Sequence, residues 1–190
     1  MKIKMQSFIL ALTLVATVSI YGQQKEIKTS ESSINWTGKK VTGSHTGTLN
    51  FSSGHLFFKD NALSGGEFIV DMTSLAVTDL EAGKGKEKLE GHLSSDDFFG
   101  INNHKDAKLI IKKASKTSKE GEYKVSGDLT IKGKTNPIDF SLTIHDNSAT
   151  TTLKIDRTKY DIKYGSGSFF DNLGDKTIHD EFELAVNLKM

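Results

Sequence analysis

Apolar and polar side chains alternate along most of this chain, and the alternation is clearest between residues 123 and 144. Residues 123–131 and 138–144 each place apolar side chains at every second position over most of their length. Because successive side chains of a strand point to opposite faces, this pattern predicts two strands that are apolar on one side. The stretch from Lys132 to Pro137 carries Gly, Asn and Pro and indicates the turn of an antiparallel hairpin.

The same alternation predicts further short strands elsewhere in the chain. They cover residues 33–37, 46–52, 55–59, 66–72, 107–113, 150–156 and 182–188. Ser53-Gly54 is expected to separate the second of these strands from the third. About eight or nine short antiparallel strands predict an all-β fold, either a closed barrel or a sandwich. A barrel of about eight strands has an interior that its side chains fill or that holds one elongated ligand.

One segment, residues 74–103, departs from the strand pattern and is rich in Leu, Glu, Lys and Gly. Residues 86–93 are predicted to form a short helix, with Leu89 and Leu93 on one face. This helical insertion between two strands is expected to cover one end of the fold.

The first residues have the pattern of a secretory signal. Lys2 and Lys4 precede the apolar run of residues 8–18, which is too short for a useful membrane span. We therefore expect a signal peptide at residues 1–22, one domain at residues 23–190, and a periplasmic or secreted protein.

Charge and composition exclude several functions. The chain has 25 basic and 24 acidic residues. This near balance gives no broad positive electrostatic potential that would attract nucleic acid or an anionic membrane. It has no Cys, which rules out disulfides, thiol catalysis and cysteine-ligated metals. The six His residues form no close-spaced ligand pair, so no metal or other cofactor is expected.

Arg157 is the only arginine of the chain. Its planar fork can bind a carboxylate or phosphate at two points, which lysine cannot do. Two interpretations stay open. Arg157 can pin a corner through an ion pair with Asp156, Asp161 or another acid, which is the favoured interpretation, or it can contact a ligand head group at a pocket mouth.

The phenylalanines offer a further candidate for function. They are numerous for a chain with one Trp, and they indicate either a packed core or the wall of an apolar tunnel. The set considered is Phe51, Phe57, Phe58, Phe68, Phe98, Phe99, Phe140, Phe169, Phe170 and Phe182.

Four segments resemble the YceI-like family. They are the HLSSDDFF stretch of residues 92–99, the GDLTIKGKTNPI hairpin of residues 127–138, the DRTKY corner of residues 156–160, and the GDKTI stretch of residues 174–178. The resemblance spans nearly the whole domain. One departure is the Asn102–Asp106 loop, where the family usually has a turn containing Tyr-Pro.

The resemblance implies a lipocalin-like antiparallel barrel with a long apolar pore. It implies binding of a polyisoprenoid or another long-chain amphiphile, without catalysis. Members of the family can pair as dimers, so a homodimer stays open, although no surface in this sequence indicates one.

Alternate strand positions then predict the lumen lining. These residues are Leu49, Phe51, Phe68, Val70, Met72, Leu129, Ile131, Phe140, Leu142, Leu153 and Leu184. Leu89, Leu93, Phe98, Phe99 and Arg157 are expected at a mouth or lid. Two alternatives are a structural or interaction module with a fully packed core and an enzyme acting on a lipid, although no nucleophile–base pair supports the enzyme.

Overall fold

The structure is a computed structural model that describes residues 22–190; the predicted signal falls almost wholly on residues 1–21, outside the described part. The described strands are β1 (Gln23–Glu26), β2 (Ser33–Lys40), β3 (Gly43–Lys59), β4 (Ala62–Val77), β5 (Asp106–Lys116), β6 (Glu122–Ile131), β7 (Lys134–His145), β8 (Ser148–Asp156) and β9 (Ile178–Lys189). The helices are α1 (Lys86–Ser94) and the 3-10 turns η1 (Thr29–Glu31), η2 (Arg157–Tyr160) and η3 (Gly174–Lys176).

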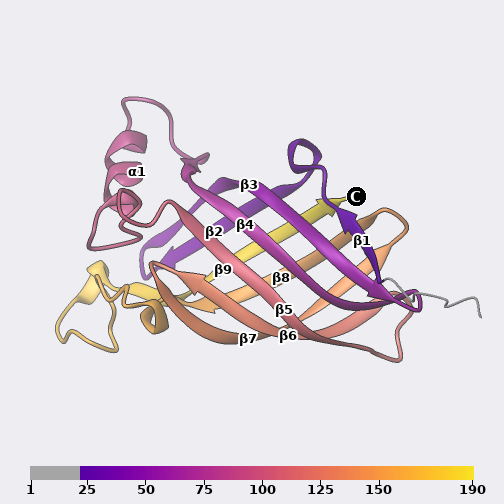
Figure 1. Cartoon of the computed structure of the whole chain (residues 1–190). Helices are drawn as coiled ribbons and strands as arrows, with labels where there is room; N and C mark the ends of the chain where they lie inside the picture. Colours follow the sequence, from indigo (N-terminus) through magenta and orange to yellow (C-terminus); the bar gives the residue numbers. More distant parts are fainter. Residues whose placement is uncertain (1–21) are drawn as a thin grey trace, which may run out of the picture.

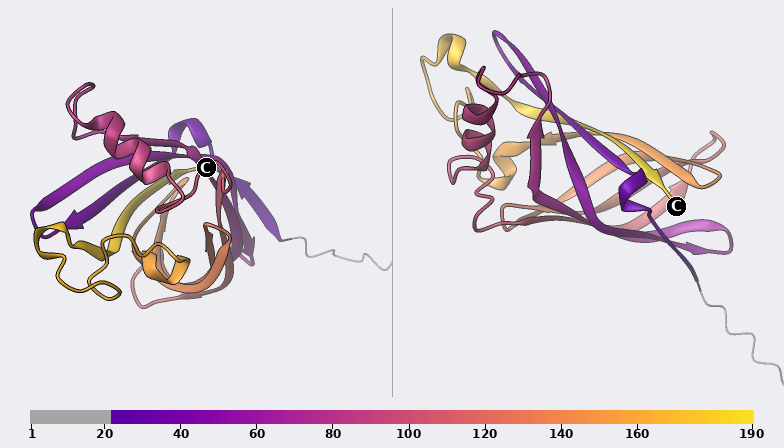
Figure 2. Two further views of the ribbon diagram at one scale, coloured as in Figure 1. Left: turned by 90° about the vertical axis from the view of Figure 1, so that its left-hand side faces the viewer. Right: turned by 90° about the horizontal axis from the view of Figure 1, so that it is seen from above.

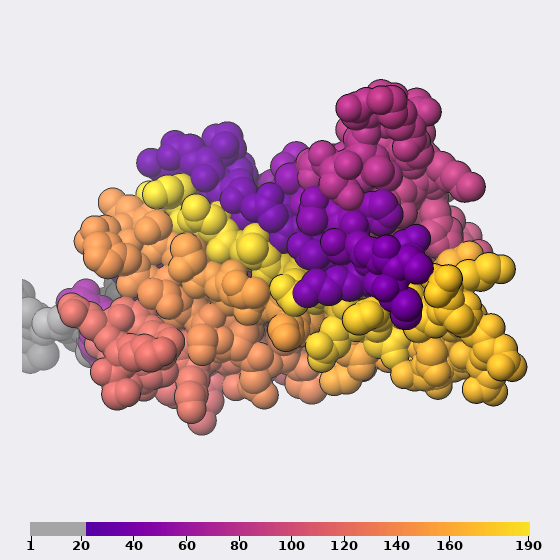
Figure 3. Space-filling view, turned by 180° about the vertical axis from the view of Figure 1, so that it is seen from behind, coloured from indigo at the N-terminus to yellow at the C-terminus, as the bar shows by residue number. Residues whose placement is uncertain are grey.

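Strands β2 to β9 form a closed, antiparallel barrel (Figure 1). Each strand pairs with the next one along the chain, and β9 returns to pair with β2 from Ser33↔Asn187 to Lys40↔Ile178. From behind, β9 (yellow) lies between β2 (indigo) and β8 (orange) (Figure 3). The prediction of an all-β barrel of about eight strands is confirmed, and closure excludes the sandwich.

The predicted helical insertion is also present, as α1 between β4 and β5. It lies at the same end of the barrel as the segment of residues 157–177 that links β8 to β9 (Figures 1 and 2). Within residues 22–190, no helix is long and apolar enough to span a bilayer.

Strand β3 corrects the prediction of a break at Ser53-Gly54. It runs unbroken for 17 residues and pairs with both β1 and β2 along one edge. Gly54 is needed for packing, because a Cβ there would lie 2.5 Å from Cδ1 of Phe68. The β3–β4 turn falls instead at Asp60 and Asn61, whose φ angles of 51° and 58° are those of a tight hairpin.

The β6–β7 hairpin is confirmed, but its turn is shorter than predicted. Lys132 and Gly133 alone form it, with φ angles of 49° and 70°, and Ile131 pairs with Lys134. Asn136 and Pro137 therefore belong to β7, opposite Leu129 and Asp128. Strand β1 was not predicted, because its four residues carry no apolar alternation.

We expect Gly47→Ala to destabilise the barrel. A Cβ at Gly47 would overlap the carbonyl oxygen of Ala76 in β4 and the indole of Trp36 in β2. Overpacking of this kind costs about 1–3 kcal/mol or more, which thermal unfolding would detect as a lower Tm.

Gly91→Ala is the matched control. Gly91 lies in α1, and a Cβ there would meet nothing within 4 Å. Alanine favours a helix interior over glycine by about 1 kcal/mol, so this variant should keep or raise the Tm. An equal loss of Tm in both variants would contradict the close packing at Gly47.

Candidate ligand cavity

The inward faces of the strands do not meet in the middle of the barrel, and an elongated cavity remains. Its lining follows β9 from Ile178 to Leu188, which corresponds to about 34 Å of strand. The space open to the centre of a water-sized sphere is about 150 Å³. Such a volume spread over such a length makes a narrow channel, and its wall is almost wholly apolar.

The structure brings all eleven residues of the predicted lumen lining to the wall of this cavity. They are Leu49, Phe51, Phe68, Val70, Met72, Leu129, Ile131, Phe140, Leu142, Leu153 and Leu184. They come from six strands, so the alternation within each strand is sufficient to place them on one inner surface.

Other wall residues were missed by the sequence analysis. Ile155, Phe182, Val186 and Leu188 line the cavity and share the alternation of their predicted neighbours, so the same signal could have found them. Leu75 also lines it, but it lies beyond the predicted end of its strand.

An aromatic cluster lies at the end of the cavity beside α1. Leu93, Phe98 and Phe99, three of the predicted lid residues, line the cavity there. The Phe99 ring lies 5.1 Å from the ring of Phe98 and 6.2 Å from that of Phe182, centroid to centroid. Leu89, also predicted for the lid, packs against the core but does not line the cavity.

Arg157 is fully buried beside this aromatic cluster. Its guanidinium donates hydrogen bonds to the carbonyl oxygens of Ile162 (2.7 Å), His179 (3.0 Å) and Ile178 (3.1 Å). Of the acids considered, Asp156 and Asp161 are not its partners: Asp156 caps η2 by accepting from Thr158, and Asp161 pairs with Lys163.

The acid that does face Arg157 is Asp180, 3.5 Å from it across the start of β9. Arg157 also lies over the Phe98 ring, 5.7 Å from its centroid. Its donors are thus used within the protein, which favours the structural interpretation over a head-group contact, although its side chain forms part of the cavity wall.

Asp180 is held ionised by its neighbours. Burial raises the pKa of its carboxyl group, but the hydroxyls of Ser166 and Ser168 and the charge of Arg157 outweigh burial and lower it. The Ser168 hydroxyl donates to Asp180 over 2.5 Å. These contacts fasten the segment of residues 157–177 to β9.

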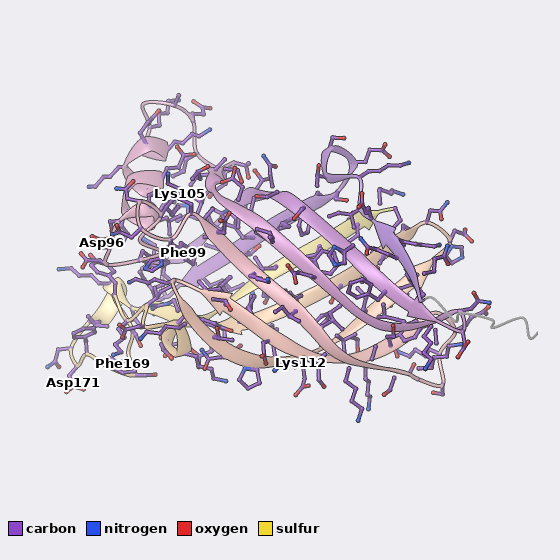
Figure 4. All side chains as sticks on the ribbon, in the orientation of Figure 1. Asp96, Phe99, Lys105, Lys112, Phe169 and Asp171 are labelled. Carbon is purple, nitrogen blue, oxygen red and sulfur yellow. The ribbon has the colours of Figure 1, made fainter. Side chains whose placement is uncertain are left out.

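Three phenylalanines of the candidate aromatic set belong to neither the tunnel nor the core, and the first, Phe57 of β3, is 39% exposed. Phe169 and Phe170 are 49% and 51% exposed. Figure 4 places Phe169 and Asp171 on the outer part of the end segment, whereas Phe99 lies beside the barrel. Phe169 and Phe170 lie in a loop, where strand alternation gives no information on which side chains face inward.

Polar residues gather at the rim of the cavity. Lys39, His179 and Glu181 line it and are exposed, at the place where the register between β2 and β9 shifts. Among the described residues, no cluster of three or more His, Asp or Glu has the geometry of a metal site.

The profile of the YceI-like domain matches residues 26–190. The chain belongs to the YceI-like family. No curated protein matches the sequence significantly.

Several solved structures share the fold. The crystal structure of BcnA from Burkholderia cenocepacia is 19% identical with a TM-score of 0.69, over 85% of this chain and 98% of that one. A polyisoprenoid-binding domain from Saccharophagus degradans is 14% identical with a TM-score of 0.58, over 86% and 95%. The YceI protein of Campylobacter jejuni is 14% identical with a TM-score of 0.53, over 100% and 92%.

We expect Arg157→Lys to destabilise the YceI-like barrel by about 2–4 kcal/mol, because lysine cannot serve three carbonyl groups from one planar fork. Urea unfolding would measure the loss. Lys159→Ala removes an exposed side chain of the same turn and should change the free energy of unfolding by less than about 0.5 kcal/mol. Equal stability of Arg157→Lys and the wild type would contradict the role of the fork.

Asp180 should also make stability depend on acid pH. Its pKa is lowered in the folded state, so its contribution is complete above the unfolded value of about 3.9 and is lost as the pH falls through the folded value. Between pH 5 and pH 2, Asp180→Asn should therefore lose less stability than the wild type in urea titrations. Asp171→Asn, at an exposed position of the same segment, should follow the wild-type slope; an unchanged slope for Asp180→Asn would refute the assignment.

Proposed function

We propose that this protein binds the long apolar chain of a lipid-like molecule, such as a polyisoprenoid, inside the barrel. We further propose that it carries this molecule in the periplasm or outside the cell, without chemical conversion. The observation that carries the proposal is the elongated, almost wholly apolar cavity.

The shape and chemistry of the cavity suit a hydrocarbon chain. Apolar wall residues follow its whole length, and the polar side chains Lys39, His179 and Glu181 lie at the rim. A ligand with one polar end can therefore keep that end near water while its chain fills the barrel. Each buried methylene contributes about 0.8 kcal/mol, so a chain can bind firmly with few polar contacts.

The structural neighbours favour the same role. One of them is described as a polyisoprenoid-binding domain, and it shares the fold over most of both chains. That ligand is carried over here as the class of molecule that best fits a narrow apolar channel.

The cavity argues against the two alternatives. A structural module with a fully packed core would leave no channel along β9. An enzyme acting on a lipid would need reactive groups beside the chain. The one buried charged side chain in the wall, Arg157, has its donors directed to backbone carbonyls.

Native mass spectrometry of protein offered polyprenols or long fatty amides tests the proposal. We expect one bound chain per barrel, recovered unchanged by organic extraction. Protein that gains no mass with any long-chain compound would refute binding, and a chemically altered extract would refute the absence of conversion.

A matched pair of variants locates the binding site. Val70→Trp fills part of the cavity, whereas Ile69→Trp places the same side chain one position along β4, on the outward face. Displacing about three methylenes should weaken binding roughly fiftyfold in Val70→Trp. Ile69→Trp should bind as the wild type does, and equal affinities for both variants would place the ligand outside the barrel.

A further inference from the structure

The wall of the barrel is incomplete between β7 and β8. These strands pair only at Thr143↔Thr150, Ile144↔Ala149 and His145↔Ser148, next to the turn that joins them. By contrast, β6 pairs with β7 from Ile131↔Lys134 to Glu122↔Thr143, and β8 pairs with β9 from Ser148↔Lys189 to Asp156↔Glu181. We call the unpaired stretch, residues 134–142 of β7 opposite residues 151–156 of β8, the β7–β8 seam.

The sequence itself keeps the seam open. Pro137, the only proline of the chain, lies in the unpaired part of β7. Hydrogen-bonded and non-hydrogen-bonded pairs alternate along an antiparallel ladder, and the two-residue turn makes Ile131↔Lys134 a hydrogen-bonded pair. The backbone groups of every second residue from Lys134 point to β6, and those of the residues between them point to β8. Pro137 is one of the residues between, so its nitrogen faces β8 but has no hydrogen to donate.

Side chains bridge the seam in place of the backbone ladder. The Thr151 hydroxyl donates to the carbonyl oxygen of Ser141 over 2.7 Å. Near the other end, the Asn136 amide donates to the carbonyl oxygen of Lys159 over 2.9 Å. Two side-chain hydrogen bonds separate more easily than a continuous ladder, because each can break alone.

A groove on the outer surface lies over part of the seam, and it shares wall residues with the cavity. Thr151 and Val186 line the apolar cavity, and both also line this groove. The rest of that groove is formed by uncharged residues: Ser33, Asn35, Ser141, Thr143, Thr150, Thr152, Ala185 and Asn187. An apolar chain that crosses here therefore meets no charged side chain in the groove.

The barrel end beside α1 is fastened more firmly than the seam. Phe98, Phe99 and Phe182 pack against one another there, and Arg157 joins three backbone carbonyls behind them. Moving this wall would break a buried, charge-assisted network, whereas opening the seam breaks two neutral side-chain hydrogen bonds, one between β8 and β7 and one between β7 and the η2 turn that follows β8.

We propose that the β7–β8 seam is a side portal through which an apolar chain slides into and out of the barrel. This inference rests on the proposed function, since it describes how the same cavity is filled. A lateral opening admits a long chain along its length, so the chain does not have to thread through one end.

A cross-link across the seam tests the portal. The chain has no Cys, so Ser141→Cys with Thr152→Cys, two positions that line the outer groove, can be joined by a short bifunctional thiol reagent. Uptake of the fluorescent polyene parinaric acid, followed by stopped flow, should slow at least tenfold in the joined protein. Protein loaded before cross-linking should release the probe correspondingly slowly.

Ser141→Cys with Lys124→Cys is the matched control. These residues face each other in the complete β6–β7 ladder, so the same reagent joins strands that are already paired. This variant should take up the probe at the wild-type rate. Equal rates in the two cross-linked proteins would overturn the portal while leaving the proposed function intact, whereas no uptake by any protein, wild type included, would overturn both.

Thr151→Val tests the portal without a cross-link. It keeps the shape of the side chain but removes the hydroxyl that bridges to Ser141. Uptake and release should both accelerate about fivefold, the factor that one neutral hydrogen bond is worth. Rates equal to those of the wild type would show that the seam does not limit exchange.

Discussion

The pairing of β9 with β2 is the interaction on which the rest of this structure depends. It joins the last strand of the meander to the first strand of the ring, from Ser33↔Asn187 to Lys40↔Ile178. Without it, the sheet would keep two long edges and its apolar face would be free to fold onto itself or onto another chain. With it, the circumference is fixed by eight strands, and the interior cannot shrink to the size of its side chains.

The cavity follows from that fixed circumference. A void of about 150 Å³ costs about 3–4 kcal/mol at the rate measured for apolar cavities in protein cores. A lining of Leu, Ile, Val and Phe gains little from water, because such cavities stay dry. A hydrocarbon chain recovers the lost dispersion contacts without requiring a polar partner, so the empty barrel already has the physical properties of a binding site.

Local alternation predicted the inner surface well because it depends only on neighbouring residues. Phe68, Val70 and Met72 could be placed on one face from their spacing alone, and the structure puts all three in the cavity wall. Contacts between residues far apart in the sequence could not be predicted in this way. The alternation alone could not choose a barrel over a sandwich, since that choice depends on the pairing of β9 with β2; the barrel was predicted only through the family resemblance.

The details that the sequence analysis missed at Gly54 and Arg157 also depend on contacts between residues far apart in the sequence. Glycine is typical of turns, but Gly54 lies within β3, where its lack of a side chain leaves room for the Phe68 ring of the neighbouring strand. Arg157 has acids beside it in sequence, but its carbonyl partners lie in a loop and in the start of β9. Each of these residues meets its partner only after the chain has folded.

A closed barrel that exchanges its contents must satisfy two opposed requirements. A complete ladder protects every backbone group and leaves no edge, but it also seals the interior, so one strand pair has to remain weaker than the others. The placement of Pro137 meets both needs, because its nitrogen has no hydrogen to leave unsatisfied when the strands part. Thr151 and Asn136 then satisfy nearby carbonyl groups with side chains that can rotate away, which a backbone donor cannot do without moving its strand. The ring of paired strands thus fixes the cavity, and the β7–β8 pair is the place where the ring can open for the proposed exchange.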